Sequence, residues 1–131
     1  MKKIGIINQP ISSIIAGLGH MNSLGICDAG LPIPEDVTRI DLALKRGLPS
    51  FLETLEVILE EMQVESAILA TEIKENNQEI EQGIINLLGD IPITYVTHEN
   101  FKVESGSTAA IIRTGEFTPY ANIILLAGVV F

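Results

Sequence analysis

The chain has 131 residues, of which 47% are hydrophobic and only 5% aromatic, with no Trp. This length suits one domain built around a single aliphatic core. The formal net charge of −9 repels phosphate backbones and anionic lipid headgroups. We therefore expect neither nucleic acid nor a membrane surface as a partner.

The sequence shows no targeting or membrane-spanning segment. The stretch 1–8 has two lysines but lacks the apolar region and cleavage site of a signal peptide. The longest apolar run, 123–131, is far shorter than the roughly 18 residues of a membrane span. Cys27 is the only cysteine, so no internal disulfide is possible. These features favour the cytoplasm.

Regular elements are expected throughout the first part of the chain. Apolar residues at helical spacing over 10–18 predict a helix that starts near Pro10 and ends before Gly19. Short strands are predicted at 24–28 and 38–44. The proline-rich segment between these two strands is expected to form a loop.

A second helix is predicted over 51–62, because Ser50 and Glu53 match the capping-box pattern in which each side chain binds a free backbone N–H. A continuous apolar run at 64–70 predicts a buried strand, and helical spacing returns over 75–88. We interpret the acidic residues between Glu53 and Glu65 as a solvated helix face.

The remaining strands are expected at 91–96, 109–113 and 122–130. Helices of about a dozen residues that alternate with short buried strands predict a three-layer α/β fold, with a mostly parallel central sheet flanked by helices. Ligands bind at the carboxyl ends of strands in such sheets. Asp28 and His98 both follow predicted strands, which makes them candidate site residues.

The two histidines and Asp28 each allow two interpretations. His20 follows a predicted helix, where it either binds the last carbonyl groups or acts as a general acid or base. Asp28 precedes Ala-Gly and either forms an Asx turn or binds a ligand. His98 either caps or lies on the surface of a helix start near Glu99, or it belongs to a ligand-binding site. Cys27 is interpreted as a buried core thiol.

The segment 112–122 is dense in hydrogen-bonding groups and lies between two apolar strands. Polar loops on a rigid scaffold often bind ligands. Tyr120 offers an aromatic face and a hydroxyl group, and Asn122 offers a donor and an acceptor, which suits a neutral polyol. The sequence contains no metal-ligand spacing and no phosphate-binding or dinucleotide motif, so neither a metal nor another cofactor is expected.

Five stretches, taken together, carry a resemblance to a known family. They are Leu-Gly-His at 18–20, Cys-Asp-Ala-Gly-Leu-Pro-Ile-Pro at 27–34, Arg-Ile-Asp at 39–41, Glu-Met-Gln-Val-Glu at 61–65, and Arg-Thr-Gly-Glu through Pro-Tyr-Ala-Asn at 113–122. In order and spacing, the chain resembles the D-ribose pyranase family over residues 1–131.

The resemblance implies an isomerase that interconverts the β-pyranose and β-furanose forms of D-ribose without a metal or organic cofactor. It also implies an α/β fold and a ring-shaped homo-oligomer, typically a decamer, with sites near the subunit interfaces. His20 matches the proton donor of the family. The implied sugar-binding positions are Asp28, His98, Tyr120, Ala121 and Asn122.

We therefore expect His20 and Asp28 to form one wall of a sugar site together with His98 and 120–122. The general base stays open between Asp28, His98 and water. One departure is Asn22, where the family often has Asp; an amide carries no charge and would support an imidazolium less. The alternatives are a mutarotase for another sugar such as fucose, a non-catalytic sugar-binding accessory protein of ribose transport, and a phosphocarrier with a phosphorylated histidine.

Overall fold

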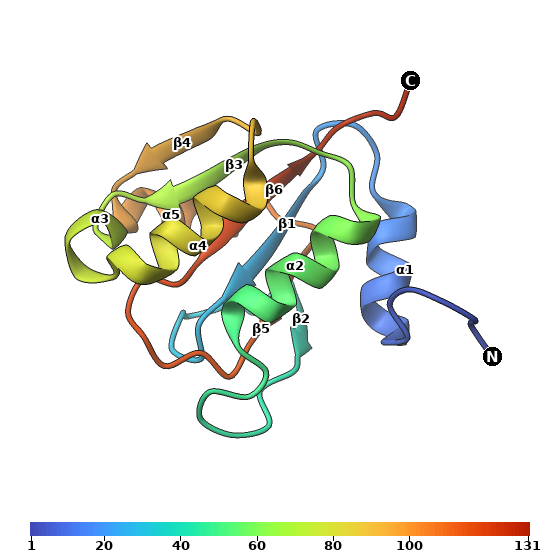
Figure 1. Ribbon diagram of the computed structural model, residues 1–131, viewed down its shortest axis with the longest axis horizontal. Coiled ribbons are helices and arrows are strands. Elements are labelled where there is room, and N and C mark those ends of the chain that lie inside the picture. The colour runs from blue at the N-terminus through green and yellow to red at the C-terminus, as the bar shows by residue number, and fades with distance from the viewer.

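The computed structural model describes residues 1–131 and consists of a six-stranded sheet with helices on both faces (Figure 1). No helix is both long enough and apolar enough to cross a bilayer. The helices are α1 (Gln9–Gly17), α2 (Phe51–Glu61), α3 (Ile73–Asn76), α4 (Gln78–Leu88) and α5 (His98–Ser105). The strands are β1 (Ser23–Cys27), β2 (Thr38–Asp41), β3 (Val64–Ala70), β4 (Ile93–Val96), β5 (Ala110–Arg113) and β6 (Ile123–Ala127).

The strand order across the sheet is β2-β5-β1-β6-β3-β4. The pairs β2·β5, β5·β1 and β3·β4 are parallel, whereas β6 is antiparallel to both of its neighbours, β1 and β3. The prediction of a mostly parallel sheet is therefore confirmed. The sequence did not indicate that β6 is reversed. This reversal brings the start of β6 to the edge where the other five strands end.

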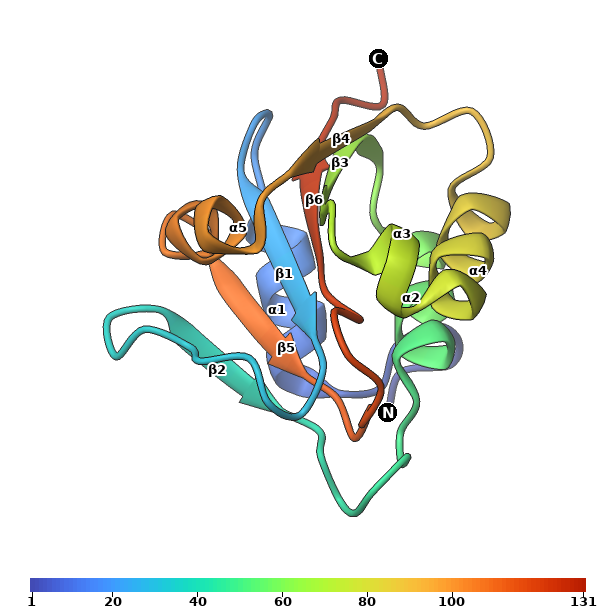
Figure 2. The same cartoon turned by 90° about the vertical axis from the view of Figure 1, so that its left-hand side faces the viewer.

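Two apolar clusters of unequal size hold the three layers together. The larger cluster has 22 buried residues and joins α1, α2 and α4 to one face of the sheet. The smaller cluster has 7 buried residues and joins Phe101 of α5 and the loop after β1 to the opposite face. Figure 2 shows α5 on one side of the sheet and α2, α3 and α4 on the other. The predicted three-layer α/β architecture is thus confirmed.

The ends of the helices follow local side-chain chemistry. Asn8 caps α1, since its Oδ1 accepts a hydrogen bond from the Ile11 N–H at 3.1 Å, and Pro10 lies in the first turn. Ser50 and Glu53 form the predicted capping box at the start of α2. Both helices therefore begin close to where the sequence predicts.

Several predicted boundaries are too generous. The expected helix over 75–88 is two helices, because Asn77 leaves the helical conformation with φ −155° and caps α4. The strand expected at 38–44 ends at Asp41, and the strand expected at 122–130 ends at Ala127. Apolar residues continue beyond these strand ends without backbone pairing, and hydrophobicity alone does not reveal where pairing stops.

Candidate active site

Three of the predicted site residues reach one edge of the sheet from different elements. Asp28 directly follows β1, and His98 begins α5, just after β4. Asn122 directly precedes β6, and because this strand is reversed, Asn122 arrives at the same edge. Residues separated by more than ninety positions in the sequence are thereby placed at the carboxyl edge of the parallel strands, where α/β proteins bind ligands.

Asp28 and Asn122 hold each other in a reciprocal pair of hydrogen bonds. The Asn122 Nδ2 donates to Asp28 Oδ2 at 3.0 Å, and the Asp28 backbone N–H donates to Asn122 Oδ1 at 2.9 Å. The backbone N–H groups of Gly30 and Leu31 donate to Asp28 Oδ1, both at 2.9 Å. The Asx turn expected for Asp28 is therefore present, and it fixes the carboxylate at the edge of the sheet.

Burial raises the pKa of the Asp28 carboxyl above its ordinary value of 3.8, and the hydrogen bonds from Gly30, Asn122 and Leu31 oppose that rise. Burial prevails because the carboxylate loses water on the side where the turn covers it. A carboxyl that is partly desolvated and already oriented is a good acceptor for a ligand hydroxyl.

His98 and Tyr120 form the aromatic part of the same site. Their rings meet edge to face, with centroids 5.1 Å apart. The backbone N–H of His98 donates to both Glu72 carboxylate oxygens at 3.0 and 3.1 Å, which fixes the start of α5. The Nδ1 of His98 is buried and has no hydrogen-bond partner within the protein. Because buried polar atoms are nearly always paired, this nitrogen is available to a ligand.

A pocket of about 250 Å³ lies among these side chains. Ala121, also predicted to contact sugar, is fully buried and packs in the larger core cluster, so its side chain does not line the pocket. The lining combines a carboxylate, an imidazole, a phenol and an amide, which suits a ligand rich in hydroxyl groups. The lining residues are Asp28, Gly30, Leu31, Pro32, His98, Pro119, Tyr120 and Asn122.

A second pocket of about 300 Å³ adjoins the first and shares Asp28, Gly30 and Pro119 with it. Much of its wall comes from Arg113, the last residue of β5, and from the polar segment that follows this strand. The Arg113 guanidinium binds both carboxylate oxygens of Asp41 at 3.2 Å. The predicted binding loop therefore lines a continuous polar surface on both sides of Asp28.

Cys27 takes no part in this surface. Its side chain is fully buried in the smaller core cluster. Burial, reinforced by the neighbouring Asp28 charge, raises the pKa of the Cys27 thiol to about 12. A thiol in this state is not a nucleophile at neutral pH, which supports the interpretation of Cys27 as a core residue.

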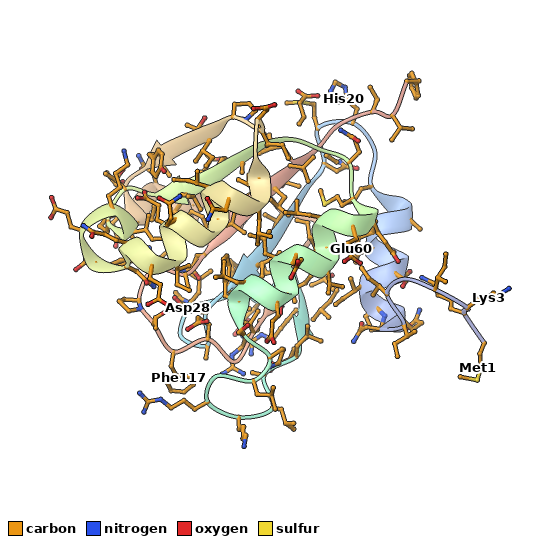
Figure 3. All side chains as sticks on the ribbon, in the orientation of Figure 1. Met1, Lys3, His20, Asp28, Glu60 and Phe117 are labelled. Carbon is orange, nitrogen blue, oxygen red and sulfur yellow. The ribbon has the colours of Figure 1, made fainter.

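His20 lies at the opposite edge of the sheet, in the turn that precedes β1. Figure 3 shows His20 at the top of the molecule and Asp28 well apart from it, at the lower left. Four steps along β1, from Ser23 to Cys27, separate the two edges by about 13 Å, and both residues lie beyond the strand. The expectation that His20 and Asp28 form one wall of a site is therefore wrong within a single chain. Closeness in the sequence did not mean closeness in space here, because β1 runs across the sheet between the two residues.

A tight turn presents the His20 side chain to solvent. The Asn22 N–H donates to Gly19 O at 3.0 Å, and Met21 has φ +69°, so His20 is the second residue of a type II turn. The Asn22 Oδ1 accepts from the Gly19 N–H at 2.8 Å. Met21 and Asn22 also form backbone hydrogen bonds with Ala127 at the end of β6. Asn22 thus stabilises the turn, and its side chain makes no hydrogen bond to the imidazole.

The carboxylate beside His20 belongs to Glu65, which the sequence did not single out. The His20 Nε2 lies 2.8 Å from Glu65 Oε2, and both side chains are about half exposed (51% and 49%). The interpretation of Glu53 to Glu65 as one helix face is wrong, because α2 ends at Glu61 and Glu65 lies on β3. The only sequence signal for Glu65 is its place in the stretch Glu-Met-Gln-Val-Glu.

An apolar groove of about 460 Å³ runs beside His20. Its walls come from the end of α1, the turn after α2 and the segment that follows β6. Val130 and Phe131 are almost fully exposed there, with 83% and 101% of their reference surface accessible. The edge that carries His20 is therefore apolar and uncovered, whereas the edge that carries Asp28 is polar and hydrogen-bonded.

These features define a small α/β protein with a polar pocket at the carboxyl edge of a six-stranded sheet and an exposed histidine at the opposite edge. The model of the RbsD / FucU transport protein family matches residues 1–130. The chain belongs to this family.

Known relatives agree with this assignment along the whole chain. A protein from Coprothermobacter proteolyticus named D-ribose pyranase is 53% identical over 131 residues, which cover 100% of both chains. The structure of Bacillus subtilis RbsD complexed with D-ribose is 53% identical, with a TM-score of 0.98 and 100% of both chains covered. The fucose mutarotase of Streptococcus pneumoniae in complex with L-fucose is 26% identical, with a TM-score of 0.85 and 100% of both chains covered.

Proposed function

We propose that this protein is a D-ribose pyranase, an isomerase that interconverts the β-pyranose and β-furanose forms of D-ribose. The observation that carries the proposal is the full-length identity of 53% to a protein of that name and to a structure that holds D-ribose. The pocket supports it, because Asp28, His98, Tyr120 and Asn122 supply donors and acceptors suited to a neutral sugar.

The reaction needs only proton transfers. A proton is delivered to the ring oxygen, the bond from this oxygen to C1 breaks, and the hydroxyl on C1 passes its proton to a base, which is Asp28, His98 or water, to give the aldehyde. The 4-hydroxyl then attacks C1 and closes the furanose ring. General acid–base catalysis by one placed side chain contributes about 10²–10⁴-fold to the rate of such a step. We assign the acid to His20 and the binding of the sugar hydroxyls to the pocket residues.

We further propose that each complete site combines two copies of the chain. His20 of one copy would stand over the pocket of the next copy, because the two parts lie at opposite edges of one chain. The uncovered apolar surface around Val130 and Phe131 supports a contact of this edge with another copy. A head-to-tail contact joins different surfaces and forms a ring where the rotation between copies closes, in line with the ring-shaped oligomer, typically a decamer, that the resemblance implies.

Saturation-transfer proton NMR on D-ribose tests the activity directly, because it measures exchange between pyranose and furanose forms. We expect the protein to accelerate this exchange for D-ribose far more than pyranose exchange for L-fucose. Binding of ribose without faster exchange would instead support a non-catalytic accessory protein. Faster exchange for fucose than for ribose would support the fucose mutarotase alternative.

Mixing two inactive variants tests the shared site. Subunits with His20→Ala keep an intact pocket, and subunits with Asp28→Ala keep an intact histidine. Random assembly of equal amounts should leave about a quarter of the sites with both parts intact, because each part comes from a correct subunit half of the time. If the site lay within one chain, the mixture would stay as inactive as either variant alone.

The alternative of a fucose mutarotase is supported by the similarity to the fucose mutarotase of Streptococcus pneumoniae. The chain is only 26% identical to that protein, however, against 53% to the relative that holds D-ribose. The phosphocarrier alternative is disfavoured by Glu65, whose carboxylate lies 2.8 Å from His20 Nε2 and would repel a phosphoryl group there.

A further inference from the structure

His20 has one charged side-chain partner, Glu65, which comes from a distant part of the sequence. The Glu65 Oε2 lies 2.8 Å from His20 Nε2, although the two residues are 45 positions apart in the sequence. The pair joins the turn before β1 to the start of β3. We propose that Glu65 is a positioning residue for the proton transfer at His20. This inference rests on the proposed function.

A β-bulge in the sheet directs the Glu65 side chain outwards. In the pairing of β3 with β6, Val64 lies opposite Ala127 and Ser66 lies opposite Leu126, so Glu65 is the additional residue between them. Bulges change the direction of a side chain and occur often beside active sites. Glu65 therefore has no residue opposite it on β6, and its side chain lies beside His20.

Gly128 leaves the space that Glu65 needs. A Cβ atom at position 128 would lie 3.1 Å from the Glu65 Cβ and 3.5 Å from its backbone nitrogen. The Gly128 N–H also donates to Gln63 O at 3.0 Å, which holds this glycine against the start of β3. Any larger residue at position 128 would press directly on the bulge.

The chemistry follows from the two hydrogen-bonding groups. A carboxylate only accepts hydrogen bonds, so it selects the His20 form that carries a proton on Nε2. The other ring nitrogen, Nδ1, then becomes the atom that exchanges a proton with the sugar. The imidazolium gives its Nδ1 proton to the ring oxygen as the C1–O bond breaks, and it regains a proton from the 4-hydroxyl when this group attacks C1 and the furanose ring closes. Glu65 balances the charge of the imidazolium and fixes the plane of the ring.

A purely structural ion pair would behave differently. Both side chains are about half exposed, and ion pairs at such surfaces contribute little to stability. Loss of Glu65 should therefore leave the melting temperature almost unchanged. A positioning role instead predicts a loss of catalytic rate with unchanged ribose affinity, since Glu65 does not line the ribose pocket.

The first test compares Glu65→Gln with Glu60→Gln in the full-length protein. Glutamine keeps the length of the side chain and removes its charge. The Glu60 side chain is exposed on α2 and makes no hydrogen bond or ion pair. We expect Glu65→Gln to lower kcat for ribose exchange by about tenfold or more, with KM and melting temperature near those of Glu60→Gln. Equal kcat values for the two variants would overturn the inference.

The second test places Glu65→Ala in a His20→Ala background. A residue that acts through His20 should have no further effect on the exchange rate once His20 is absent. A second, additive loss would overturn the inference, because Glu65 would then act on its own. If the wild-type protein failed to accelerate ribose exchange, the proposed function would fail as well. If the wild-type protein accelerated ribose exchange and Glu65→Gln did so equally well, the proposed function would stand and only the positioning role of Glu65 would be wrong.

Discussion

The two edges of the sheet are built in different ways. At the carboxyl edge, Asp28 receives hydrogen bonds from Asn122 and from two backbone N–H groups, and His98 and Tyr120 meet in a fixed contact. At the opposite edge, His20 lies half exposed in the turn between α1 and β1, with Glu65 as its one side-chain hydrogen-bond partner.

This difference assigns separate tasks to the two edges. The carboxyl edge is preorganised before ligand binds, which reduces the entropy that a bound sugar must lose with it. The His20 edge has few constraints within one chain and an apolar surface that a second copy can cover. In the site that we propose, sugar binding is a property of the single chain, whereas catalysis depends on how two chains meet.

Replacing His20 with Ala should separate the two tasks most clearly. The exchange rate for D-ribose should fall by about 10²–10⁴-fold, the usual contribution of a general acid. Because the imidazole is half exposed and its side-chain hydrogen bond is to Glu65, the melting temperature and ribose affinity should change little. Saturation-transfer NMR and calorimetry measure these quantities. A variant that exchanges ribose at the wild-type rate would show that His20 is not the acid.

Replacing Asn122 with Ala should damage the preorganised edge instead. The change removes two hydrogen bonds to Asp28 and leaves the Asp28 Oδ2 and the Asp28 backbone N–H without their partners, which costs about 1–3 kcal/mol of folding free energy. Ribose affinity should fall with it. Denaturant unfolding and ribose titration measure the two effects.

Asn86→Ala is the matched control for Asn122→Ala. The Asn86 side chain accepts one hydrogen bond from Gln82 on the exposed face of α4, so its loss should change the folding free energy by only about 0.5 kcal/mol. Equal losses for the two variants would contradict the preorganisation of the Asp28 edge.

The sequence predicted the fold better than it predicted the site. Periodicity and caps located α1 and α2 because these signals are local. The grouping of Asp28 with His98 and Asn122 followed from strand ends and from the family resemblance. The position of His20 did not follow, because it depends on the direction of β1 across the sheet. Glu65 was missed because its contact with His20 joins distant parts of the chain at a β-bulge, and no local sequence pattern predicts such a bulge.

The raised pKa of Asp28 predicts a pH effect confined to the carboxyl edge. Because burial raises the folded-state pKa above 3.8, the folded protein holds this proton more tightly than the unfolded chain does. Asp28 therefore favours folding below 3.8, and this contribution is lost as the pH rises through the folded-state pKa. Measured against Asp28→Asn, the wild-type free energy of unfolding should increase as the pH falls through that window. An unchanged difference between the two proteins would contradict the cause assigned to the shift.

The smallest expected effect concerns the turn that carries His20. Met21 has φ +69°, a left-handed conformation that costs a residue other than glycine about 1–2 kcal/mol. Met21→Gly removes this strain, while the more flexible unfolded chain opposes the gain by about 0.5–1 kcal/mol. The net gain should therefore be no more than about 1.5 kcal/mol, seen as a rise of a few degrees in melting temperature. Met21→Ala, which keeps a Cβ and loses the same exposed side chain, should show no such rise. If glycine instead lowered the melting temperature below that of the alanine variant, the turn would not be strained, and the exposed edge would be held as firmly as the edge that carries Asp28.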